Sequence, residues 1–269
     1  MLSIRGLTVH HQLQTLVHPL DLQLHRGEWL ALAGESGSGK TLTSLAIGGL
    51  LSADLHAHGS IQLEGKELLH LSEPELRHIR GREIAYVFQD YQSAFTPFIT
   101  IGKQMDEMIR AHTSLSRQQR QHSCLAHLEQ VELPAKQVYN SYPFELSGGQ
   151  LQRAAIATAL LLSPKVLIAD EPTTALDSLT SRSIIQLIQR IQQETGIAIL
   201  WITHDLRQVQ RTADTLLIMK SGQVVESGKS HSIFFHPTHP YTVQLLSSIP
   251  KLPSRYQNRA VCGFSGSHN

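Results

Sequence analysis

Cysteine is nearly absent from this chain of 269 residues, which contains only Cys124 and Cys262. The two cysteines lie far apart in the sequence and form no C-x-x-C pattern. A disulfide framework, a zinc knuckle and an iron–sulfur cluster are therefore poorly supported. This cysteine content favours a reducing compartment.

Long hydrophobic runs are also lacking, since no segment reaches the roughly 18 apolar residues that a membrane-spanning helix needs. Shorter runs, such as Val166–Ala169 and Ile197–Ile202, have the length of buried parallel strands. The N-terminus begins directly with strand-like alternation and shows no signal-peptide pattern. We therefore expect a cytosolic protein that reaches a membrane only through a partner.

Neither sign of charge predominates in the sequence. Lys and Arg number 23 and Asp and Glu number 22, which gives a formal net charge of +1. Nucleic-acid-binding proteins concentrate positive charge on one face, so the composition gives no support for a nucleic-acid partner. The length suffices for one large α/β domain, or for one domain with appendages.

The most informative feature that is present is a phosphate-binding loop with the pattern G-x-x-x-x-G-K-[ST]. A buried-strand pattern at Trp29–Ala33 precedes it, and a helix pattern follows. Lys40 can reach the β- and γ-phosphates, and the Thr41 hydroxyl can bind Mg²⁺. The sequence thus predicts a nucleoside triphosphate site. Its expected lining residues are Gly34, Glu35, Ser36, Gly37, Ser38, Gly39, Lys40 and Thr41.

Two further patterns suit phosphate chemistry. The apolar run Val166–Ala169 leads into Asp170, which can bind Mg²⁺, and Glu171, which can polarise an attacking water. Taken alone, that segment would favour an ordinary core strand with acids at its exit. Leu146–Gln150 (LSGGQ) begins a helix whose first amides can face an anion, although a simple helix cap accounts for it equally well.

Taken together and in this order, the motifs resemble the nucleotide-binding subunit of an ATP-binding cassette (ABC) transporter. The resemblance covers residues 1 to about 250, and the order of LSGGQ, Walker B segment and switch histidine is very specific to that family. Its motifs are the phosphate loop at Gly34–Thr41, the Q-loop at Gln89, the signature at Leu146–Gln150, the Walker B segment at Val166–Glu171, the D-loop at Ala175–Asp177 and the switch histidine His204.

The implied fold is α/β: a P-loop NTPase core of the ABC ATPase type, with an N-terminal antiparallel β-subdomain and an inserted α-helical subdomain. We expect a hairpin turn at His25–Glu28, a strand at Val166–Asp170, a helix at Ser178–Thr195, and a loosely packed extension from about His231. The expected divisions are 1–92 (first part of the catalytic core), 93–150 (helical signature subdomain), 151–230 (second part of the core) and 231–269 (C-terminal extension).

The resemblance also implies a composite site, in which two such domains close head to tail around ATP. Lys40 and Thr41 would hold ATP and Mg²⁺ on one side, and Asp177 would cross the interface. The signature residues expected to contact the ATP of the partner subunit are Ser147, Gly148, Gly149 and Gln150.

Catalytic roles follow from the same resemblance. Glu171 would be the general base, His204 would hydrogen-bond the γ-phosphate, and Gln89 would sense Mg²⁺ and water. Expected Mg²⁺ ligands are Thr41, Gln89 and Asp170. The family usually stacks adenine on an aromatic residue before the phosphate loop, and His11 best matches that position by spacing.

Several segments resemble the peptide/nickel importer branch of the family. They are Tyr91–Pro97, Ser141–Glu145 and His236–Thr242. That branch implies a second ATPase subunit, which would form a heterodimer with this chain; a homodimer is the other option. It also implies two transmembrane permeases and an extracytoplasmic solute-binding protein. The subunit would then lie peripherally on the cytoplasmic face of the cell membrane. The tail lacks the cysteine cluster of many peptide importers, which favours nickel or metal–metallophore uptake over oligopeptide or dipeptide uptake.

Other functions fit less well. Soluble ABC ATPases of DNA repair or translation carry long coiled-coil insertions or two cassettes, and this chain has neither; an exporter subunit is disfavoured by the importer-type segments. The sixteen histidines are scattered and have no acidic or cysteine partners that would complete a metal site.

Overall fold

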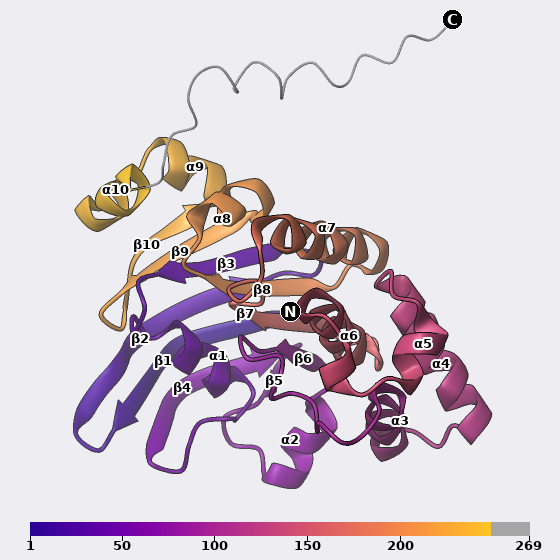
Figure 1. The fold of residues 1–269 in the computed structure, drawn as a ribbon. Helices are drawn as coiled ribbons and strands as arrows, with labels where there is room; N and C mark the ends of the chain where they lie inside the picture. Colours follow the sequence, from indigo (N-terminus) through magenta and orange to yellow (C-terminus); the bar gives the residue numbers. More distant parts are fainter. Residues whose placement is uncertain (249–269) are drawn as a thin grey trace, which may run out of the picture.

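The computed structural model describes residues 1–248, and two β-sheets organise this part of the chain (Figure 1). The first sheet is antiparallel and has the strand order β2-β1-β4-β5. Its strands are β1 (Leu2–His11), β2 (Gln14–Leu24), β4 (Leu55–Leu63) and β5 (Lys66–Glu67).

The second sheet has six strands in the order β10-β9-β3-β8-β7-β6. All neighbours from β9 to β6 are parallel, and β10 joins the edge antiparallel to β9. The strands are β3 (Trp29–Gly34), β6 (Ile84–Val87), β7 (Val166–Asp170), β8 (Ala198–Thr203), β9 (Thr215–Lys220) and β10 (Gln223–Lys229).

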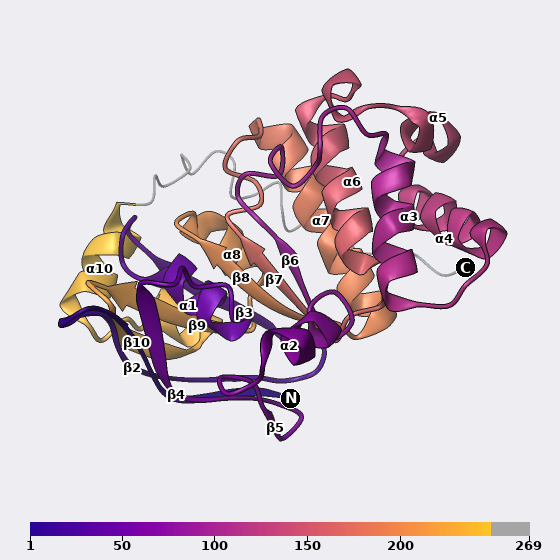
Figure 2. The ribbon, with the colours of Figure 1, turned by 90° about the horizontal axis from the view of Figure 1, so that it is seen from below.

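Helices cover the second sheet and extend to one side of it. Viewed from below, α3, α4 and α6 lie on one side of the molecule and α10 lies on the other (Figure 2). The helices are α1 (Lys40–Ile47), α2 (Glu73–Ile79), α3 (Ile101–His112), α4 (Arg117–Gln130), α5 (Ala135–Asn140), the 3₁₀ helix η1 (Pro143–Glu145), α6 (Gly148–Leu160), α7 (Ser178–Thr195), α8 (Leu206–Thr212), α9 (Ser230–Phe235) and α10 (Pro240–Ser247).

The central strands are buried on both faces, as their continuous apolar sequences predict. Leu30 and Leu32 of β3 pack into a cluster shared with the N-terminal sheet. Ala31 and Ala33 face the cluster that α8, α9 and α10 complete. β3 is therefore fixed from both sides, and its end holds the following loop in a defined place.

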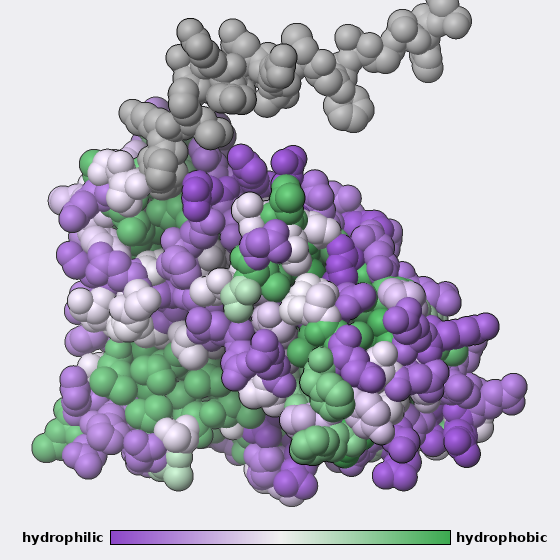
Figure 3. Space-filling model, viewed as in Figure 1, coloured by the Kyte–Doolittle hydropathy of each residue, from purple (hydrophilic) through white to green (hydrophobic). Residues whose placement is uncertain are grey.

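The residues assigned to the helical subdomain (93–150) contain α3, α4, α5 and η1. Cys124 and Leu128 of α4 are fully buried, whereas the outer surface of this region is largely hydrophilic (Figure 3). In residues 1–248, no helix combines the length and the apolar character that crossing a bilayer requires.

Two expectations about local structure are wrong. His25–Glu28 forms a turn, but it joins β2 of the first sheet to β3 of the second and makes no hairpin. Residues 231–248 are not loosely packed, because α9 and α10 bury Ile233 and Tyr241 against the core. The rest of the expected extension, 249–269, lies outside the described residues.

Candidate functional site

The site forms at the carboxyl edge of the second sheet. Parallel strands end at the same edge, and the residues that follow them come together there. β3 leads into the phosphate loop, β7 ends at Asp170, and β8 is followed by His204. β7 and β8 are neighbours, with Asp170 opposite Ile202, and β8 also pairs with β3. The sheet thus brings three motifs together that are distant in the sequence.

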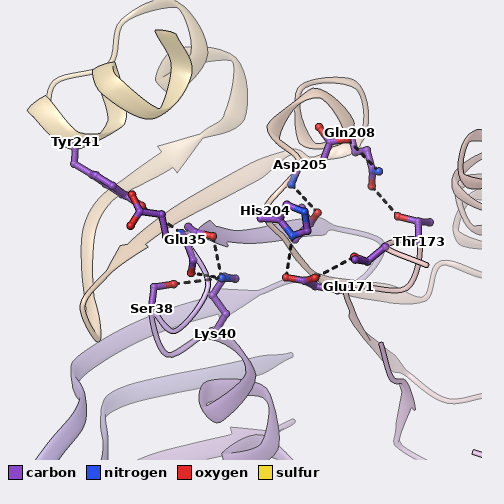
Figure 4. Close-up of polar contacts among 12 residues, drawn as sticks. Glu35, Ser38, Lys40, Glu171, Thr173, His204, Asp205, Gln208 and Tyr241 are labelled. Atoms are coloured by element: carbon purple, nitrogen blue, oxygen red, sulfur yellow. Dashed lines mark hydrogen bonds and ion pairs between the residues drawn. The ribbon is translucent and has the colours of Figure 1, made fainter. Parts of the chain in front are cut away.

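Lys40 lies inside the phosphate loop (Figure 4). Its Nζ donates hydrogen bonds to the carbonyl oxygens of Gly34 (2.9 Å) and Glu35 (2.7 Å), and Ser38 Oγ lies 3.3 Å away. Burial lowers the pKa of the Lys40 amine, and the carboxylates of Glu171 and Asp170 act in the opposite direction. The loop therefore holds an ammonium group that is largely removed from solvent.

Gly39 directly precedes α1 at a position that favours glycine. Gly39 has φ +100°, and a Cβ there would lie 3.1 Å from Val17 and 3.2 Å from Met219. Gly39 is the N-cap of α1 and offers no side chain to the first N–H groups of that helix. Those amides are therefore available to an anion, as the phosphate-loop pattern requires.

Asp170 has the properties of a ligand for a hard cation. Burial raises the pKa of its carboxyl, and a hydrogen bond from Thr41 opposes that shift. Its Oδ1 is buried and has no hydrogen-bond partner within residues 1–248. An unpartnered buried carboxylate oxygen beside a hydroxyl suits Mg²⁺, which commonly takes one or two protein ligands besides phosphate and water.

Gln89 follows the end of β6 at the same edge of the sheet and is exposed. The histidines form no metal site of their own. Within the described part of the chain, no group of three or more His, Cys, Asp or Glu side chains is placed to hold a metal ion.

Glu171 and His204 are in direct contact. His204 Nδ1 lies 3.0 Å from Glu171 Oε1, and Thr174 Oγ1 donates to Glu171 Oε2 at 3.0 Å. The Glu171 backbone adopts φ +45°, an unfavourable angle for a non-glycine residue, and its N–H bonds the carbonyl of Ile202. The carboxylate is therefore fixed in orientation at the end of β7.

The signature segment begins α6 with a capping box. Ser147 Oγ accepts the N–H of Gln150, and Gln150 Oε1 accepts the N–H of Ser147. A Cβ on Gly148 would lie 2.9 Å from the hydroxyl of Tyr91, and one on Gly149 would lie 2.7 Å from a methyl of Thr180. Both glycines therefore permit close packing, a role that the sequence did not reveal.

The remaining predicted residues take these positions. Asp177 caps α7 by accepting the N–H groups of Leu179 and Thr180, and hydrogen bonds led by the Thr180 hydroxyl lower the pKa of its carboxyl. His11 lies at the end of β1 with Nε2 3.3 Å from Asp54 Oδ2, and both side chains are exposed. Neither arrangement tests the interface or adenine roles that we expect.

Two polar links to the site were not predicted. Gln152 of α6 is fully buried and donates from Nε2 to the carbonyl of Pro172 at 2.6 Å, directly after Glu171. Tyr241 of α10 accepts a hydrogen bond from the N–H of Glu35 at 3.2 Å. The segment His236–Thr242 signals an importer branch, but no sequence pattern connects Tyr241 with the phosphate loop.

Comparison with known proteins agrees with this geometry. Residues 17–174 match the model of the ABC transporter family. Over 96% of both chains, the sequence is 40% identical to the metal-staphylopine import system ATP-binding protein CntD of Staphylococcus aureus. It is 42% identical to the oligopeptide transport ATP-binding protein OppD of Haemophilus influenzae, over 88% of this chain and 74% of that protein.

Solved structures show the same fold. The dimeric bacterial ABC transporter cassette MJ0796 superimposes with a TM-score of 0.76 at 29% identity, covering 86% of this chain and 99% of the cassette. A dimeric post-hydrolysis state of the same cassette, bound to ADP and Pi, matches equally well. The predicted α/β fold of the ABC ATPase type is confirmed.

Proposed function

Since this chain belongs to the ABC transporter family and is an ATPase of importer type, we propose that it drives the uptake of nickel or a metal–metallophore complex. Oligopeptide uptake is the second candidate, because the relatives include both CntD, of a metal-staphylopine import system, and the oligopeptide transport protein OppD. The match to CntD over 96% of both chains supports the metal substrate.

One observation supports the ATPase site most directly. Lys40, Asp170, Glu171 and His204 lie together at one edge of the second sheet. The phosphate loop would hold the ATP phosphates with its amides and with Lys40. Thr41 and Asp170, with Gln89 nearby, would hold Mg²⁺, which when bound neutralises charge on the β- and γ-phosphates.

Glu171 would act as the general base by accepting a proton from the attacking water. Its second contact, with Thr174, holds the carboxylate plane, so that His204 and Thr174 together restrict its rotation. His204 would in turn present its other ring nitrogen to the γ-phosphate. Water loses its proton to Glu171 as its oxygen bonds phosphorus and the bond to the ADP oxygen breaks.

The signature would serve an ATP held by a second ATPase subunit. Its glycines pack against Tyr91 and Thr180 of its own chain, which leaves the exposed Ser147 at the front of α6. The cassette MJ0796 is dimeric, which supports a composite site. We propose a heterodimer, with Asp177 at its interface and adenine stacked on His11.

The permease contact would lie on the helical side, with the subunit on the cytoplasmic face of the membrane. Phe98 is 84% exposed and Phe144 66% exposed. The N–H of Ile101 bonds the carbonyl of Ser141, so their segments are neighbours. Green, apolar patches lie near α6 on the otherwise hydrophilic helical side (Figure 3). Residues 93–150 would move with the permease as one subdomain.

Uptake in a strain deleted for this gene tests the proposal. The strain is complemented with the wild-type gene or with Glu171→Gln, and radioactive nickel, nickel with a metallophore, and a labelled tripeptide are offered separately. Loss of nickel uptake that only the wild type restores supports the metal substrate. Loss of tripeptide uptake alone favours the oligopeptide alternative, and unchanged uptake of all three contradicts importer function for these solutes.

A further inference from the structure

Tyr241 connects the C-terminal helix α10 to the phosphate loop. It is 4% exposed, and its hydroxyl accepts the hydrogen bond from the Glu35 N–H across 206 residues of sequence (Figure 4). Glu35 is the second residue of the loop that the ATPase site depends on. Tyr241 itself belongs to none of the motifs that account for hydrolysis.

The segment before α10 is built to direct Tyr241 toward the loop. The carboxylate of Glu226 on β10 accepts the N–H of Thr238 (2.8 Å) and that of His239 (3.1 Å). His239 Nδ1 then accepts the Tyr241 N–H at 3.1 Å and so caps the helix. Pro240 occupies the first turn, where its missing N–H is not needed. The start of α10 is therefore held by two side chains, those of Glu226 and His239.

The ring of Tyr241 is held as firmly as its backbone. It packs in a cluster with Ala33, Ile218 and Ile233, and the Lys220 ammonium lies 4.6 Å from the ring centroid. A cation over an aromatic face is attracted by the ring quadrupole. Burial raises the pKa of the Tyr241 hydroxyl, so the phenol stays neutral and keeps its hydrogen-bonding role at physiological pH.

A second contact joins the same part of the chain to the loop. Gly222, in the turn between β9 and β10, donates its N–H to the Ser38 carbonyl at 3.0 Å. The loop is thus held at Glu35 and at Ser38 by residues of the last third of the chain. Because phosphate binding depends on the directions of the loop amides, a shift at either point changes the site.

We propose that Tyr241 is a positioning residue for the phosphate loop, and that the segment Ser230–Ser248 thereby sets the affinity of this site for ATP. The inference rests on the proposed role of Gly34–Thr41 in ATP binding. Tyr241 acts through the Glu35 amide and does not itself contact the nucleotide.

Tyr241→Phe in the full chain tests this, because it removes the hydroxyl and keeps the ring, its packing and the Lys220 contact. Loss of one neutral hydrogen bond predicts a rise in the dissociation constant for ATP of about two- to tenfold. In the assembled ATPase, KM should rise while kcat changes less. Exchange of the Glu35 amide hydrogen should accelerate. Gln244→Ala, a change of an exposed residue on the same helix, is the matched control. It should leave the dissociation constant for ATP, the KM and the exchange of the Glu35 amide unchanged.

Lys40→Ala separates failure of this inference from failure of the loop assignment. If Lys40→Ala binds ATP as the wild type does, the loop assignment is wrong. If Lys40→Ala loses ATP binding while Tyr241→Phe keeps wild-type affinity and wild-type exchange at Glu35, Tyr241 has no positioning role. A lower melting temperature of Tyr241→Phe with unchanged affinity would likewise reduce Tyr241 to a packing residue and overturn the proposal.

Discussion

His204 Nδ1 and Glu171 Oε1 lie 3.0 Å apart, although the two residues follow different strands of the central sheet. A neutral imidazole that donates from Nδ1 to this carboxylate leaves Nε2 as an acceptor, so only the protonated ring, which donates from both nitrogens, can bond Glu171 and a phosphate oxygen together. The carboxylate therefore orients the ring, and the ring in turn restrains the carboxylate. This pairing couples the orientations of the two side chains.

Glu171→Gln should reduce ATP hydrolysis by about a hundredfold or more, which is the contribution typical of general base catalysis. The amide keeps the shape and can still bond His204, so ATP binding and folding should be retained. Steady-state ATPase rates and an ATP titration of the same preparation measure the two effects. Wild-type turnover would rule out Glu171 as the base.

Gly148→Ala should destabilise the fold by about 1–3 kcal/mol, as overpacking does. The new Cβ would lie 2.9 Å from the Tyr91 hydroxyl, and Tyr91 is buried. The next nearest atoms, on Leu176 and on the Tyr91 ring, are 3.7 and 3.9 Å away, which is ordinary contact. Thermal denaturation without ATP measures the effect.

Tyr91→Phe should restore most of that loss, because it removes the one atom that lies too close. The double variant is compared with Tyr91→Phe alone, which isolates the coupling between the two positions. If the two changes are additive, the Tyr91 hydroxyl does not contact Gly148 in solution.

The sequence predicted where the strands of this edge end, and so which side chains lie there. A buried apolar run followed by acids places Asp170 and Glu171 at a sheet edge, and the same logic places Lys40 and His204. The helix at Ser178–Thr195 also has the predicted bounds, since Asp177 and Gly196 are strong start and stop signals. These features depend on residues close together in the sequence.

What the sequence did not predict depends on contacts between distant residues. The turn at His25–Glu28 looks like a hairpin until strand pairing assigns its two strands to different sheets. Tyr91, Gln152 and Tyr241 each reach a motif from another element, and no local pattern indicates which partner they have. Residues 231–248 pack on the core for the same reason, although their composition is typical of a loose segment.

Cys124 should be unreactive toward thiol reagents in the native protein. Burial raises the pKa of its thiol to about 12, with the Asp106 carboxylate acting in the same direction, so almost no thiolate exists at a pH of about 8. We expect a Cys262→Ser variant to react with a chromogenic disulfide only after denaturant unfolds it. Rapid modification of the folded variant would show that the helical subdomain opens readily around α4.

Gln152→Met should lower the stability of the fold. It should also lower kcat for ATP hydrolysis by a larger factor than it weakens the affinity for ATP. The change removes the donor to the Pro172 carbonyl, and an unsatisfied buried acceptor costs about 1–3 kcal/mol. Part of that cost is offset, because Gln152 Oε1 is buried without a hydrogen-bond partner in residues 1–248. Since Pro172 follows Glu171, movement of this carbonyl would displace Glu171, the proposed general base, while the phosphate loop stays in place. Urea denaturation and separate measurements of kcat and ATP affinity give the two effects.

Gln152→Glu sharpens the test, because its effect should depend on pH. The ionised carboxylate would face the Pro172 carbonyl without a proton to donate, whereas the protonated acid donates one. Burial and this bond both raise the folded-state pKa of the introduced carboxyl above its unfolded value, so the variant should lose stability as the pH rises. Its free energy of unfolding should exceed that of Gln152→Met at a pH of about 4, where the protonated acid donates the bond, and fall below it at a pH of about 8. If both variants retain wild-type stability and turnover, the bond from α6 does not hold the residue after Glu171 in place.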